Sequence, residues 1–63
     1  MPIAVVHLLK GRTGEQRALL IRNVTKAITE SLDVKPEQVR VILQEQDAEN
    51  WGVGGLPISR RDQ

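Results

Sequence analysis

An amphipathic pattern dominates the middle of the chain, from Gly14 to Leu32. Apolar side chains recur there at steps of three and four residues, and charged side chains share the opposite face, as in a helix with one buried side. Thr13 and Gln16 have the spacing of a capping box, in which each side chain bonds the backbone N–H of the other residue. Pro36 prevents the helix from continuing. The pattern therefore predicts one helix over residues 14–32.

An apolar segment lies on each side of this helix. The segment from Ile3 to Leu9 is apolar except for His7, and both of its alternating faces are apolar at the start. This predicts a strand that is covered on both sides. The segment from Val39 to Glu45 alternates in the same way and predicts a second strand, with Arg40 on one of its faces. A strand, a helix and a second strand form a βαβ unit, for which we expect parallel pairing.

The C-terminal part of the chain is richer in glycine. Within residues 51–55, three glycines follow Trp51, which predicts tight turns with positive φ and a short hairpin. The residues from Pro57 to Gln63 are predicted to form a polar tail. We therefore expect a single α+β domain over residues 1–63, a βαβ unit followed by a short C-terminal β-hairpin.

A chain of 63 residues buries too little apolar surface for a large core of its own. Small proteins gain stability from disulfides, a structural metal or association with other chains. This chain has no cysteine and one histidine, His7, which excludes disulfides and metal sites built from cysteines or several histidines. We therefore expect a homo-oligomer, in which two chains form a four-stranded sheet backed by two helices.

Charge and hydropathy exclude other classes of partner. Nine basic and eight acidic residues give a net charge of +1, which offers no electrostatic reason to bind nucleic acid or an anionic membrane. The longest apolar run, residues 3–6, is too short to cross a bilayer. The N-terminus also lacks the pattern of a signal peptide. These features predict a cytoplasmic protein with no nucleic-acid or membrane partner.

Pro2 is the first candidate for chemistry. Its small side chain permits removal of Met1, after which the chain begins with a secondary amine. An α-amino group titrates at about 7.7–8.0, and an apolar pocket with nearby cations lowers such a pKa toward neutrality, where a general base works best. Proline is also a common second residue, and the chemistry of this position alone favours an ordinary chain start over a base.

Arg12, Arg40 and Trp51 are the other candidates. Arg40 alternates with apolar residues on a predicted strand, where a buried guanidinium is costly without an anionic partner, and this favours a binding site. Arg12 precedes the predicted helix and fits either a solvated loop or a site. Trp51 fits either a core or a pocket wall.

Several segments together resemble the 4-oxalocrotonate tautomerase family, in the superfamily with an amino-terminal proline. These segments, which span nearly the whole chain, are Pro2 to Thr13 with Glu15 and Gln16, Leu20 to Arg22, Val39 to Ile42, and Trp51 to Gly55. The resemblance implies a βαβ unit with a C-terminal hairpin, paired chains, and a homohexamer built as a trimer of dimers. It also implies an isomerase of aromatic hydrocarbon catabolism that uses neither cofactor nor metal. Such an enzyme moves a proton in an unsaturated 2-keto or enol dicarboxylate, as in the conversion of 2-hydroxymuconate to 2-oxo-3-hexenedioate.

The resemblance further assigns roles by position. Pro2 would be the base that abstracts and returns the proton. Arg12 would bind the distal carboxylate, and Arg40 from a neighbouring chain would bind the 2-oxygen and the near carboxylate. Leu9 and Trp51 would form the apolar wall of the substrate site.

Departures from the family pattern leave alternatives open. The family usually has phenylalanine where this chain has Trp51, which changes the pocket volume and leaves the preferred substrate open. Related dehalogenases carry an acidic residue near this aromatic; here the residue two positions on is Val53, whereas Glu49 lies two positions before it. If Met1 stays attached, the Pro2 nitrogen is an amide without useful basicity, and the chain would be a non-catalytic subunit that keeps the fold.

Overall fold

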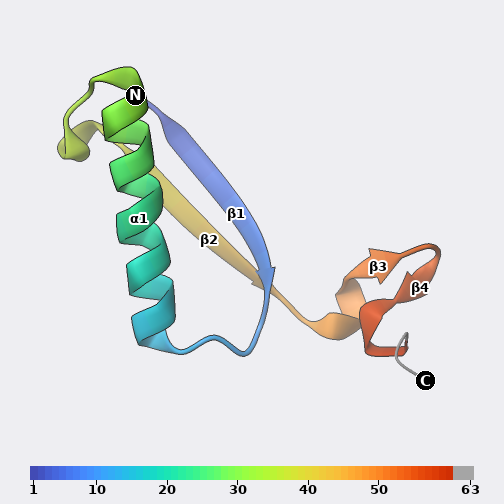
Figure 1. The fold of residues 1–63 in the computed structure, drawn as a ribbon. Coiled ribbons are helices and arrows are strands. Elements are labelled where there is room, and N and C mark those ends of the chain that lie inside the picture. The colour runs from blue at the N-terminus through green and yellow to red at the C-terminus, as the bar shows by residue number, and fades with distance from the viewer. Residues whose placement is uncertain (61–63) are drawn as a thin grey trace.

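A βαβ body and a projecting hairpin make up the protein (Figure 1). The structure is a computed structural model and describes residues 1–60. In chain order the main elements are β1 (Ile3–Leu9), α1 (Gly14–Leu32), β2 (Arg40–Gln46), β3 (Gly52–Val53) and β4 (Leu56–Pro57). Three short 3-10 helices connect or follow them, namely η1 (Pro36–Gln38), η2 (Ala48–Asn50) and η3 (Ile58–Arg60).

Helix α1 has the predicted bounds and the predicted start. The hydroxyl of Thr13 accepts from the Gln16 N–H over 3.0 Å, and the Gln16 side chain accepts from the Thr13 N–H over 3.0 Å. The capping box is therefore confirmed, and it satisfies two donors at the helix start. The helix ends at Asp33, which adopts the left-handed conformation with φ 56°. Aspartate tolerates this conformation better than most residues do.

Strands β1 and β2 pair in parallel, with Ile3 beside Arg40 and Leu9 beside Gln46. This confirms the βαβ prediction. The second strand begins one residue later than predicted because the Val39 N–H donates to the Pro36 carbonyl in η1, over 3.1 Å. The ladder starts with the next N–H, that of Arg40. Among residues 1–60, Val39 is the one apolar residue that is buried, with 9% of its surface exposed.

The two faces of the sheet differ in cover. Helix α1 covers one face of the sheet (Figure 1). That face carries Ala4, Val6 and Leu8, which are half-buried, and Leu8 lines a pocket together with Leu20 of α1. The opposite face, which we call the open face, leaves Ile3 62% and Val5 49% exposed. The prediction that β1 is covered on both sides is therefore wrong for a single copy, and cover on the open face has to come from outside the chain.

The hairpin β3–β4 stands away from the body as an arm, residues 51–60 (Figure 1). Its turn holds Gly54 at φ 64° and Gly55 at φ 91°, as the glycine pattern predicts. The arm extends the radius of gyration to 14.8 Å, against about 11 Å for a compact chain of this length.

The predicted polar tail is wrong over residues 57–60. Pro57 belongs to β4, and Ile58 donates its N–H to the Trp51 carbonyl over 2.7 Å, which closes the arm. The rest of the predicted tail, residues 61–63, lies outside the described residues.

Candidate functional site

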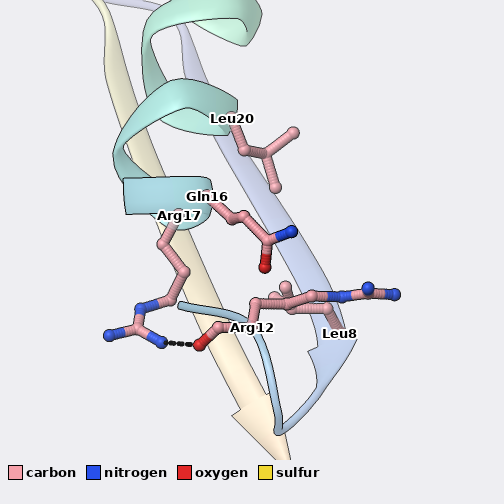
Figure 2. A pocket seen from close by; sticks show the side chains of 5 residues that line it. All are labelled: Leu8, Arg12, Gln16, Arg17 and Leu20. Carbon is pink, nitrogen blue, oxygen red and sulfur yellow. Dashed lines mark hydrogen bonds between the residues drawn. The ribbon is translucent and has the colours of Figure 1, made fainter. Parts of the chain in front are cut away.

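A pocket of about 240 Å³ lies where β1 ends and α1 begins (Figure 2). Its lining residues are Leu8, Arg12, Gln16, Arg17 and Leu20. The apolar part comes from Leu8 and Leu20, and the polar part from side chains around the helix start. Such a pocket suits an anion with an apolar body, because the guanidinium of Arg12 offers forked donors that match a carboxylate.

The side chain of Arg12 is exposed and extends across Leu8, away from Arg17 (Figure 2). The backbone carbonyl of Arg12 points the other way and accepts a hydrogen bond from Arg17 Nη1 over 2.6 Å. Arg17 Nη1 also lies 3.2 Å from Glu45 Oε2 on β2. The two guanidinium groups therefore face different surroundings, although their residues touch.

Pro2 and Arg40 lie together at the other end of the sheet. The Arg40 N–H donates to the Pro2 carbonyl over 2.9 Å, and Arg40 Nη1 donates to the Glu37 carbonyl over 2.8 Å. Pro2 is half-buried and Arg40 is exposed. The sequence argument for a buried Arg40 is therefore wrong within one copy, because the residue stands at the first position of β2 on the open face.

One chain does not bring Pro2 and Arg12 together. Pro2 precedes β1 and Arg12 follows it, and the seven residues of the strand cover about 20 Å at the usual rise per residue. A small dicarboxylate is much shorter than this distance.

Leu9 and Trp51 lie beyond this first pocket. Leu9 ends β1 with the parity of the open face, opposite to Leu8, and is half-buried. Trp51 is half-buried and lines a second hollow at the base of the arm, with His7, Gln46, Asn50 and Gly52. Leu8, rather than Leu9, is thus the leucine beside Arg12.

Glu49 lies in η2, directly before the arm, and Val53 is exposed on β3. Within residues 1–60, histidine and carboxylate side chains form no group of three that could hold a metal ion. No helix in that part of the chain has the length and apolar character needed to cross a membrane.

Leu8, Gln16 and Arg17 are not among the residues that the sequence marks as candidates for this site. The spacing of Gln16 from Thr13 indicates only a capping box. Arg17 and Glu45 are 28 positions apart, and nothing in a single sequence signals that their side chains meet.

Comparisons with known proteins all match the chain to tautomerases. The family model described as "Tautomerase enzyme" matches residues 2–61. A 2-hydroxymuconate tautomerase of Pseudomonas putida is 47% identical over 60 residues, which cover 95% of each chain.

Solved structures give the same relationship. TomN, a 4-oxalocrotonate tautomerase homologue of the tomaymycin biosynthetic pathway, superposes with a TM-score of 0.93 at 40% identity, over 95% of this chain and 92% of that one. A heterohexameric 4-oxalocrotonate tautomerase of Chloroflexus aurantiacus gives a TM-score of 0.91 at 34% identity, over 97% and 98% of the two chains.

Proposed function

The chain belongs to the tautomerase family and is an isomerase, and we propose that its substrates are unsaturated 2-keto or enol dicarboxylates of the 2-hydroxymuconate type. The observation that carries this proposal is the 47% identity to a 2-hydroxymuconate tautomerase over 95% of the chain. The chain also has all three proposed site residues, Pro2, Arg12 and Arg40. The reaction moves a proton between carbons of the conjugated system and draws on no cofactor. The same proposal puts the enzyme in the cytoplasm, within aromatic hydrocarbon catabolism.

Pro2 is the proposed general base. Once Met1 is removed, its nitrogen is a secondary amine one residue before β1. Pro2 is half-buried and its carbonyl is held by the Arg40 N–H, so the ring has a defined place at the edge of the sheet. The amine takes a proton from one carbon and returns it to another. Such a catalyst works best when its protonated and unprotonated forms are both well populated at neutral pH.

The two arginines are the proposed anion binders. Arg12 binds the distal carboxylate and draws electron density along the conjugated chain. Arg40 binds the 2-oxygen and the near carboxylate, and its bond to that oxygen strengthens as negative charge develops there. The hydrogen bond to the Glu37 carbonyl uses one of the five N–H groups of Arg40, so the fork still offers donors to a substrate. Leu9 and Trp51 supply the apolar wall.

We further propose that each site is shared between copies. If β1 pairs in antiparallel fashion with β1 of a second copy, Pro2 of one chain comes beside Leu9 and Arg12 of the other. This pairing extends the two-stranded sheet to four strands backed by two helices. The exposed apolar side chains of the open face, including Ile3 and Val5, then favour association of three such dimers into a homohexamer, and Arg40 comes from a neighbouring chain.

The test combines a mass with a rate. Intact-mass analysis of the purified protein should show a chain without Met1, and this form should ketonise 2-hydroxymuconate in a spectrophotometric assay. Pro2→Ala should lose most of that rate, about a hundredfold or more, because it replaces the positioned secondary amine. A Pro2→Ala variant as fast as the unmodified chain would refute the proposed base.

The same intact-mass measurement distinguishes the enzyme from the alternative, a non-catalytic subunit. A chain that keeps Met1 in its natural host has an acylated Pro2 nitrogen and would turn over no substrate. A dehalogenase would instead release halide from a haloacrylate, which an ion-selective electrode measures directly.

A further inference from the structure

Arg17 holds the backbone of Arg12 in place. Arg17 lies in the first turn of α1, where its own N–H donates to the Thr13 carbonyl over 3.0 Å. Its side chain turns back past the helix start, and Nη1 donates to the Arg12 carbonyl over 2.6 Å. A guanidinium donor makes a stronger hydrogen bond than a neutral one, so this contact restrains the loop before the helix.

The peptide unit between Arg12 and Thr13 is held at both of its polar groups. Its carbonyl, that of Arg12, accepts from Arg17. Its N–H, that of Thr13, donates to the Gln16 side chain over 3.0 Å. Because a peptide unit is planar, these two contacts fix its orientation and with it the place of the Arg12 Cα, from which the side chain extends.

Glu45 connects this arrangement to the sheet. Its carboxylate lies 3.2 Å from Arg17 Nη1, and the two side chains are only 30% and 37% exposed. Such a pair adds little to the free energy of unfolding while it is partly solvated. Its effect is positional, since it keeps the Arg17 guanidinium over the Arg12 carbonyl and compensates a second positive charge near the pocket.

We infer that Arg17, anchored by Glu45, is a positioning residue that aims the Arg12 guanidinium at the substrate's distal carboxylate. Figure 2 shows the two side chains leaving in opposite directions from this shared contact. The inference rests on the proposed function, because it assumes that Arg12 binds that carboxylate. It adds a residue that touches the backbone of Arg12 rather than the substrate.

The variant Arg17→Met tests the inference, because it removes every donor and keeps an apolar stem of similar reach. We expect kcat/KM for the dicarboxylate substrate to fall about tenfold, mostly through KM. The same variant should have little effect on an analogue that lacks the distal carboxylate, and it should have little further effect in an Arg12→Ala background. A Glu45→Gln change should give a smaller loss of the same kind, and Arg17→Lys should restore part of it.

Arg22→Met is the matched control, since it removes the same charge from another position of α1. It should leave both substrates unaffected. The inference is overturned if Arg17→Met, folded by circular dichroism, slows both substrates equally or slows neither. Should Arg17→Met not fold, Glu45→Gln decides by the same two-substrate comparison.

Failure of the proposed function looks different. In that case Arg12→Ala itself would not discriminate between the dicarboxylate and the analogue. If Arg12→Ala discriminates and neither Arg17→Met nor Glu45→Gln does, only the positioning role is lost.

Discussion

Pro2 and Arg12 stand at opposite ends of β1, one residue before the strand and three residues after it. The strand between them is about 20 Å long. Each copy therefore carries the proposed base at one end of its sheet and a proposed carboxylate binder at the other. Under the proposed assembly, each copy contributes residues to more than one site and completes none of them alone.

Mixing two inactive variants should restore activity. Pro2→Ala lacks the base, and Arg12→Ala lacks the carboxylate binder. In a mixed pair, one site carries both changes while the other has an intact Pro2 and an intact Arg12. After joint unfolding and refolding of equal amounts, half of the pairs are mixed, so about a quarter of the original sites should be active. The measurement is the rate of ketonisation before and after mixing. A mixture no faster than the average of its two parents would show that one chain supplies both residues.

Arg40→Lys should be clearly impaired, although it keeps the charge. Lysine cannot offer the forked donors that match a carboxylate and an adjacent oxygen. We expect kcat/KM to fall about tenfold, with kcat affected as well because the contact strengthens in the transition state. Steady-state kinetics on 2-hydroxymuconate measure both parameters. Lys26→Met, which removes an exposed charge from α1, should behave as the unmodified protein does; equal rates in Arg40→Lys would remove the proposed role.

Val5→Asp should break the assembly. Val5 lies on the open face with 49% of its surface exposed in a single copy, so a carboxylate there meets water in the monomer and an apolar contact in the oligomer. Sedimentation velocity should show a smaller species than the unmodified protein forms. Asn23→Asp adds the same charge on the exposed part of α1 and should leave the sedimentation coefficient unchanged. If Val5→Asp sediments with the unmodified protein, the open face is not an interface.

Thr13→Ala should lower the free energy of unfolding by about 1 kcal/mol, because it leaves the Gln16 N–H without its cap acceptor. Thr29→Ala is the comparison. The Thr29 hydroxyl donates to the Lys26 carbonyl within the helix, a contact that competes with the helical backbone, so its loss should be neutral or slightly stabilising. Chemical denaturation at one fixed protein concentration measures both changes. Equal effects at the two positions would contradict a specific role for the cap.

The βαβ body could be predicted because its signals are local. The period of the apolar residues, the Thr13–Gln16 pair and Pro36 act within a few positions of the elements that they define. Strand β2 starts one residue later than predicted. The Val39 N–H can bond either the η1 turn or the neighbouring strand, and the sequence does not show that it bonds the Pro36 carbonyl. The arm continues further along the chain than predicted for a similar reason, because the Ile58 N–H bonds the Trp51 carbonyl across the turn.

The site was harder to predict than the fold. Pro2, Arg12 and Arg40 stand out only as a set that resembles a family, and their use in one site stays a proposal. Leu9 and Leu8 are adjacent in sequence yet belong to opposite faces of β1, so a one-residue difference decides which of them lies beside Arg12. The contact between Arg17 and Glu45 joins a helix to a strand and follows from the packing of α1 on the sheet.

The arm also bears on the order of events during synthesis. It is the last described part of the chain to leave the ribosome, and its hairpin closes through contacts of its own, such as that between Ile58 and Trp51. The helix and both long strands are therefore already outside the exit tunnel when the arm emerges. A newborn chain can thus form its βαβ body before its arm.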